Sequence, residues 1–165
     1  MYGRGQRVWA WSLVAVQLLL LGGLVWTPGS RTWSTPGWLV GVAILMLAAA
    51  SLIALAGVAE LGQGLTASPL PSAAAQLRTT GVYACVRHPI YGGLLLGGAG
   101  VALLSGRLTR VWVWLALLAL LRLKVGLEER ALTARFADYG AYAAATPRLV
   151  PSAVRCWRRL RAGKS

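Results

Sequence analysis

Long runs without a charged residue constrain this chain more than any other feature of its sequence. Val8–Trp26 is a run of nineteen uncharged residues, and Gly37–Ala59 is a second uncharged run. Each is long enough for an α-helix that crosses a bilayer core of about 30 Å. Pro89–Ser105 is a third apolar run, and a fourth begins at Val111. We therefore predict an all-α, polytopic integral membrane protein with about four transmembrane helices and a cytoplasmic C-terminal helix.

The composition supports a membrane protein. Hydrophobic residues make up 57% of the chain, whereas soluble domains are about 45–50% apolar even with glycine counted. The formal net charge is +13, and most of the positive charge lies toward the carboxyl end, beside apolar runs. This placement favours anionic lipid headgroups as partners, and no motif of a nucleic-acid-binding fold is present. We expect membrane lipids and no nucleic acid as partners.

The basic residues also predict an orientation. Ten of the 17 Lys and Arg residues lie from Arg122 onward. With four spans, both ends of the chain and the polar linker Glu60–Thr80 lie on one side, which the excess of positive charge marks as cytoplasmic. Thr27–Pro36 and Gly106–Arg110 are expected to be turns on the other side. Gly93 and Gly97 lie four residues apart in the third run, which predicts a close helix contact.

The only histidine, His88, lies where the polar linker meets the third run. Pro89 suits the first position of a helix, because its missing N–H has no intrahelical partner there. Arg87 and His88 are therefore expected at the mouth of a helix. Free backbone N–H groups and the positive end of the helix dipole favour an anionic ligand at such a place.

Two adjacent glutamates follow the fourth run, in a chain with only four acidic residues. Residues three or four apart share one face of a helix. A helix that continues from the fourth run would carry on one face Glu129, Leu132, Phe136, Tyr139 and, one turn further, Tyr142. We predict a single amphipathic helix that leaves the membrane here and ends before Pro147 and Pro151.

Arg122 and Lys124 interrupt the fourth run. The eleven apolar residues Val111–Leu121 are too few to cross a bilayer, so the helix must continue through both cations. They either snorkel to the interface or face a polar cavity, and both alternatives are open at this point.

Several other chemistries are poorly supported. One histidine without a cluster of Cys or Asp falls short of three protein ligands, so we expect no metal. A nucleophile elbow and a dinucleotide fingerprint are both missing. Cys85 and Cys156 do not make a disulfide framework, and Cys85 is expected to be a small apolar filler.

Together these features resemble the isoprenylcysteine carboxyl methyltransferase and phospholipid methyltransferase superfamily, whose members are integral membrane enzymes that use S-adenosylmethionine. The resemblance covers roughly residues 76–151 and is carried by Gly81-Val82-Tyr83, Arg87-His88-Pro89-x-Tyr91-x-Gly93, Glu128-Glu129-x-x-Leu132, Phe136, Tyr139-x-x-Tyr142 and Pro151. It implies a cofactor pocket closed by the linker and by the helix after the last span. It also implies cofactor contacts from Leu77, Arg78, Tyr83, His88, Pro89, Ile90, Tyr91, Glu128 and Glu129.

The resemblance assigns further roles less firmly. Methyl transfer depends mainly on alignment of the two reactants, so no catalytic residue is certain, and Arg87 and Glu128 are the candidates. Isoprenylcysteine enzymes carry an arginine one turn before the first glutamate, where this chain has Lys124, with Arg122 nearby. We predict that these two cations bind an amphiphilic acceptor. A lysine is a point charge rather than a bidentate fork, which argues against a prenylcysteine carboxylate.

We therefore predict a methyltransferase with a lipophilic acceptor from the bilayer. The predicted regions are 1–75 (amino-terminal spans and linker), 76–151 (cofactor-binding core) and 152–165 (basic tail). One alternative is a sterol-reductase-like oxidoreductase with NADPH, although such proteins commonly have Asn where this chain has Ile90. The other is a non-catalytic membrane protein on the same fold. The sequence defines neither the acceptor, nor the accepting atom, nor the oligomeric state.

Overall fold

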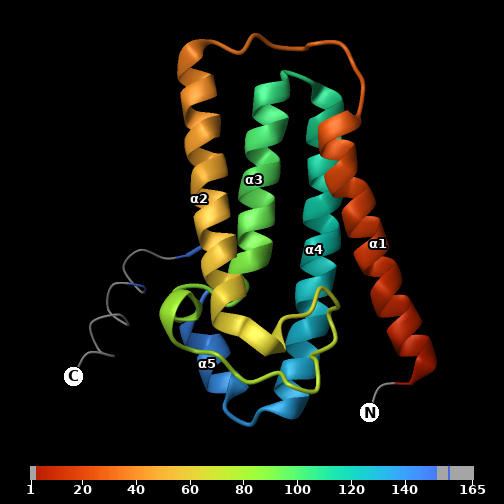
Figure 1. The fold of residues 1–165 in the computed structure, drawn as a ribbon, viewed down its shortest axis with the longest axis vertical. Coiled ribbons are helices and arrows are strands. Elements are labelled where there is room, and N and C mark those ends of the chain that lie inside the picture. Colours follow the sequence, from red (N-terminus) through yellow and green to blue (C-terminus); the bar gives the residue numbers. More distant parts are fainter. Residues whose placement is uncertain (1–2, 152–155, 157–165) are drawn as a thin grey trace.

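A computed structural model describes residues 3–151 and Cys156. The described part of the chain is helical, without strands, which confirms the all-α class. Its long helices stand side by side (Figure 1): α1 (Arg4–Trp26), α2 (Gly37–Leu61), α3 (Pro89–Ser105) and α4 (Leu108–Arg135). The shorter elements are the 3-10 turns η1 (Gly62–Gly64) and η2 (Gly81–Ala84) and the helix α5 (Tyr139–Ala145).

The long helices alternate in direction, so their connections lie at two opposite ends of the protein. The loops after α1 and α3 lie at the upper end in Figure 1, while the linker, η2 and α5 gather at the lower end. Buried side chains of α1, α3 and α4, among them Leu24, Leu95 and Leu117, form the apolar core above that lower end. The His88 motif and the two glutamates therefore share one end, as expected. Which side of the membrane this end faces stays a prediction.

Two helices have the length and composition of membrane spans. The α1 helix and the stretch Gly37–Gly64 have apolar windows with mean hydropathy 2.0 and 2.7, of which 28% and 11% is buried inside the protein. Leu19 and Leu45 are 74% and 71% exposed, as expected of side chains that face lipid rather than a soluble core. The α3 helix has 17 residues, about 25 Å at 1.5 Å per residue. A total of four spans stays a prediction.

Small residues bring α2 and α3 together. A Cβ atom at Gly93 would lie 2.9 Å from the Ala50 carbonyl oxygen, and one at Gly100 would lie 3.2 Å from the Ala43 carbonyl oxygen. A Cβ atom at Gly97 would lie 3.4 Å from the Ala50 Cβ atom. The glycines of α3 thus face the alanines of α2, as the spacing of Gly93 and Gly97 predicted.

The turn between α3 and α4 is shorter than predicted. Gly106 ends α3 with φ 65°, a left-handed conformation that glycine adopts without steric cost. The first long loop packs onto this turn: Thr32 N–H donates to the Gly106 carbonyl (2.6 Å), and Leu108 N–H donates to Thr32 Oγ1 (3.2 Å). Because Thr32 satisfies this first backbone donor, α4 begins at Leu108 instead of Val111.

The fourth helix continues through Arg122 and Lys124, as predicted, but the expectation of a single helix as far as Tyr142 is wrong. The helix ends at Arg135, and Phe136 is extended, with φ −121° and ψ 116°. Arg135 hydrogen-bonds carbonyl groups of the linker. The chain turns there, and α5 carries Tyr139 and Tyr142 back under the start of α3, where both are buried.

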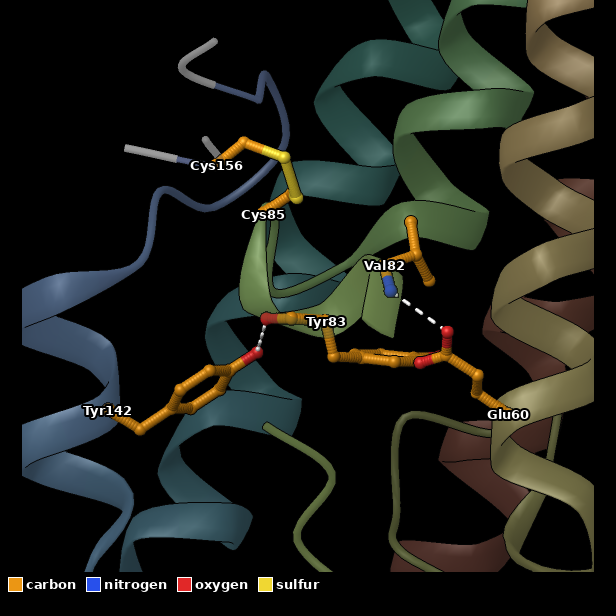
Figure 2. Close-up of a disulfide and its surroundings, with 6 residues drawn as sticks. All are labelled: Glu60, Val82, Tyr83, Cys85, Tyr142 and Cys156. Atoms are coloured by element: carbon orange, nitrogen blue, oxygen red, sulfur yellow. Dashed lines mark hydrogen bonds between the residues drawn. A yellow bond between two sulfur atoms is a disulfide. The ribbon is translucent and has the colours of Figure 1, made fainter. Parts of the chain in front are cut away.

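The expectation that Cys85 is an isolated apolar filler is also wrong. Cys85 and Cys156 form a disulfide between positions 71 residues apart (Figure 2). The chain after α5 runs back along the residues that precede α3, since Arg87 N–H donates to the Pro147 carbonyl at 2.9 Å. This return path brings the carboxyl end to η2. The predicted basic tail 152–165 otherwise lies outside the described residues.

The glycines of α3 provide a direct test of the helix packing. Gly93→Ala is expected to lower the thermal unfolding temperature in detergent, because its methyl group would press on a backbone oxygen that cannot move alone. Gly97→Ala is the matched control on the same face and should unfold close to wild type. Equal unfolding temperatures for the two variants would contradict this packing.

Candidate functional site

The start of α3 is fixed by the chain that returns after α5. His88 caps the helix and Pro89 takes its first position. His88 N–H donates to the Arg148 carbonyl at 3.0 Å, next to the bond between Arg87 and Pro147. These two backbone bonds place the Arg148 side chain beside the mouth of α3. The adjacent side chains of Arg87 and His88 therefore meet that of Arg148, which comes from a distant part of the sequence.

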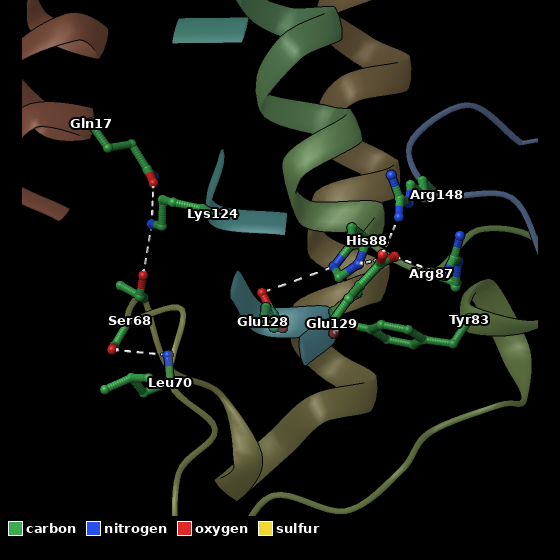
Figure 3. Close-up of polar contacts among 12 residues, drawn as sticks. Gln17, Ser68, Leu70, Tyr83, Arg87, His88, Lys124, Glu128, Glu129 and Arg148 are labelled. Atoms are coloured by element: carbon green, nitrogen blue, oxygen red, sulfur yellow. Dashed lines mark hydrogen bonds and ion pairs between the residues drawn. The ribbon is translucent and has the colours of Figure 1, made fainter. Parts of the chain in front are cut away.

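Glu129 lies at the centre of this basic cluster (Figure 3). One carboxylate oxygen is 2.8 Å from Arg87 Nη1 and 3.3 Å from His88 Nε2, and the other is 2.8 Å from Arg148 Nη2. Glu129 is buried, and the Arg87 side chain is only 10% exposed. A buried carboxylate is stable only when such partners replace its water. Glu129 thus joins α4 to the start of α3 and to the carboxyl-terminal segment.

Glu128 has a different environment from its neighbour. Its carboxylate lies 3.9 Å from His88 Nδ1, on the other edge of the imidazole ring. Its side chain is 28% exposed and lines a cavity of about 280 Å³. Small-molecule sites typically have roughly 300–1,000 Å³, so this cavity is near the lower end of that range. The two adjacent glutamates therefore have different surroundings: Glu129 is buried in an ion cluster, and Glu128 faces the cavity.

The walls of the cavity come from the linker, the start of α3, the lower part of α4 and α5. Most residues predicted to contact a cofactor line it: Leu77, Arg78, Tyr83, His88, Pro89, Ile90, Tyr91 and Glu128, together with Arg87. Glu129 is not among the lining residues, because its carboxylate is turned toward the arginines. Tyr139 and Tyr142 line the cavity as well, although the sequence analysis gave them no binding role.

Three tyrosines form a hydrogen-bonded and aromatic wall around η2. The Tyr142 hydroxyl donates to the Tyr83 carbonyl at 2.7 Å (Figure 2), and the Tyr83 hydroxyl donates to the Gly57 carbonyl at 3.3 Å. Burial, with Glu128 nearby, raises the pKa of Tyr83 well above its usual range. Burial, with Glu129 nearby, raises the pKa of Tyr139 to about 12. The hydroxyl groups of Tyr83 and Tyr142 thus act as hydrogen-bond donors within this wall.

The two predicted acceptor-binding cations lie apart. Lys124 is fully buried: its ammonium donates to Gln17 Oε1 at 2.5 Å (Figure 3) and to the Ala67 carbonyl at 2.9 Å. The ammonium also lies 5.4 Å from the centre of the Tyr91 ring. Arg122 is on the exposed side of α4. Neither lines the cavity, and their role in acceptor binding stays a prediction.

Gln17 is a site residue that the sequence analysis missed. It lies in α1, is buried, and lines the cavity opposite the linker. A glutamine inside an apolar membrane helix lacks water as a partner, so it seeks another protein group. That isolated polar residue in the run Val8–Trp26 was the available signal.

The fold and the site define a class of protein: an all-helical protein with apolar membrane-type helices and, at one end of them, a cavity lined by both apolar and polar side chains. The family model described as phospholipid methyltransferase matches residues 38–139. The match spans α2, the linker, η2, α3 and α4, which is more than half of the chain. The chain therefore belongs to the phospholipid methyltransferase family, a family of membrane methyltransferases. Searches of curated proteins and of solved structures return no match.

The unequal environments of the two glutamates can be tested by stability. Glu129→Gln is expected to destabilise the protein by roughly 3 kcal/mol, because it leaves the nearly buried Arg87 cation without its counter-ion. Glu128→Gln changes a partly exposed carboxylate of the same size and is the matched control. Thermal unfolding in detergent measures both. A similar loss of stability in the two variants would refute the conclusion that only Glu129 is a buried counter-ion.

Proposed function

We propose that this protein transfers a methyl group from S-adenosylmethionine to a lipophilic or amphiphilic acceptor drawn from the bilayer. The observation that carries the proposal is the cavity at the lower end of the helices, where a basic helix mouth, a carboxylate and several tyrosine rings converge. The family supports the reaction class, since phospholipid methyltransferases in general use this cofactor.

The side chains of the cavity match the chemical groups of the cofactor. The free N–H groups at the start of α3, with His88 and Arg78 nearby, suit the cofactor's carboxylate. Glu128 suits the hydroxyl groups of a ribose, because a carboxylate accepts hydrogen bonds from them. The rings of Tyr83 and Tyr91 suit an adenine ring and a sulfonium cation. In this proposal Glu129 acts only indirectly, by holding His88 and Arg87 in place.

The reaction itself requires little from an acid or a base. A bond forms between the acceptor atom and the methyl carbon while the carbon–sulfur bond breaks on the opposite side, and the sulfur keeps the electron pair. The protein contributes alignment of the two reactants and exclusion of water, a positioning effect that can be worth several kcal/mol. This accounts for a cavity whose residues bind and orient rather than form a catalytic triad.

A route for the acceptor lies on the membrane side of the cavity. Leu94 lines the cavity and also an apolar groove between α1, α2 and α3. The groove is floored by glycines of α3, and most of its lining is aliphatic. An acceptor in this groove would keep its hydrocarbon part in the apolar zone while its polar group reaches the cavity.

The reaction class can be tested with purified protein and a membrane lipid extract. Incubation with S-adenosylmethionine labelled at the methyl group should move label into a lipid species, which mass spectrometry would identify. In parallel, S-adenosylhomocysteine should raise the thermal unfolding temperature. A shift with NADPH instead would indicate the sterol-reductase-like alternative. No shift with either ligand and no labelled product would indicate a non-catalytic protein.

The cavity makes a prediction for cofactor affinity. His88→Ala and Glu128→Ala should each weaken S-adenosylhomocysteine binding by roughly ten- to a hundredfold, because each removes a hydrogen bond to a charged group. Isothermal titration calorimetry on folded protein measures the affinity. Arg130→Ala changes an exposed side chain on the same helix as Glu128 and should bind like wild type. Unchanged affinity in both site variants would rule out this cavity as the cofactor site.

A further inference from the structure

The linker forms an irregular strap across the cavity. We define the strap as residues 65–78, which the structure describes without regular helix or strand. Several of its side chains line the cavity, among them Leu65, Pro71 and Leu77. Its internal hydrogen bonds are local, such as Ala75 N–H to the Ser72 carbonyl at 3.1 Å. Such a segment depends on outside contacts to hold one position.

Two cations of α4 supply these contacts, one near the start of the strap and one at its middle. Lys124 donates to the Ala67 carbonyl at 2.9 Å, while Arg135 donates to the carbonyls of Ser72 and Ala73 at 2.6 and 2.8 Å. The two cations are eleven residues apart, about 16 Å along the helix axis at 1.5 Å per residue. The strap is therefore held to one helix at two separate points.

The two points differ in strength. Lys124 is fully buried, and its second bond, to Gln17, ties the same point to α1. Breaking it would leave an unpaired cation away from water, which is costly. Arg135 is exposed, and water can replace its bonds to the strap carbonyls at little cost. Besides the Arg135 contacts, the Ser72 hydroxyl donates to the Gly64 carbonyl at 3.3 Å, and Ser72 is only partly buried. The Ser72–Ala73 part of the strap is therefore the part that can release.

We propose that Arg135 is a positioning residue that latches the strap, and that the strap opens at its middle, around Ser72 and Ala73, to exchange the polar ligand of the cavity. Lys124 keeps the Ala67 part fixed, so that part stays closed while the rest opens. As a mechanism of cofactor exchange this rests on the proposed function. The movement of the strap itself does not depend on any ligand.

The latch can be tested first without a ligand, by hydrogen–deuterium exchange of the detergent-solubilised protein. In Arg135→Met, amides of residues 70–78 should exchange roughly three- to tenfold faster, since two hydrogen bonds to an exposed cation are lost. Amides near Ala67 should exchange as in wild type. Arg130→Met, a matched change at another exposed arginine of α4, should leave the strap unchanged. Equal exchange in wild type and Arg135→Met would overturn the latch.

Arg135→Lys separates the latch from the charge at the end of the helix. Lysine keeps the positive charge that stabilises the carboxyl end of α4, but its ammonium does not reproduce the paired donors of arginine. A latch predicts strap exchange between that of wild type and Arg135→Met. A role through helix charge alone predicts exchange equal to wild type, and that result would also overturn the proposal.

The role of Arg135 in ligand entry and release is tested by the binding kinetics of S-adenosylhomocysteine, measured by surface plasmon resonance. Arg135→Met should raise the association and the dissociation rate constants by a similar three- to tenfold factor, because opening precedes both steps. If the strap amides of the variant exchange hydrogen faster but the rate constants of ligand binding are unchanged, the role of the latch in ligand entry and release is refuted. A wild-type protein that does not bind the ligand would refute the proposed function, while the exchange measurement would still decide on the latch.

Discussion

The site depends on the contacts that the buried carboxylate of Glu129 makes with three basic side chains. Two guanidinium groups, those of Arg87 and Arg148, meet there with the imidazole ring of His88. Without the carboxylate between them, the two arginines would repel each other in a chain whose formal net charge is already +13. A buried ion cluster is a weak source of net stability but can impose one geometry. Here that geometry orients the edge of His88 that faces the cavity.

The parts of the fold that were predictable are those encoded by local pattern. Uncharged runs predicted most of the long helices, and the spacing of Gly93 and Gly97 predicted a close helix contact, although not that α2 is the partner. The break at Phe136 was not predictable, because the helical period of the tyrosines continues across it. The helix ends at Arg135, and the Arg135 side chain hydrogen-bonds the linker, a contact between residues more than 60 positions apart. The disulfide likewise depends on the return of the chain after α5.

The site shows the same division. His88 and Pro89 were placed correctly because proline suits the first position of a helix and a long apolar run follows Pro89. The separate tasks of Glu128 and Glu129 were not predictable, since adjacent residues on a helix differ in direction by about 100° and only the neighbours decide which is buried. Gln17 was missed for a related reason. A glutamine in an apolar run indicates that its side chain has a polar partner, but the run does not indicate that this partner is Lys124.

The disulfide gives the molecule a covalent ring. Because Cys85 and Cys156 are 71 residues apart, the ring contains α3, α4 and α5, with the ion cluster of Glu129 inside it, while α1 and α2 lie outside. If the outer two helices separated from the rest, the ring would still keep its segments tethered at both ends. Such a tether lowers the conformational entropy of the opened chain and thus the cost of closing it again. The segment with α3, α4 and α5 therefore has a covalent limit on its expansion that α1 and α2 lack.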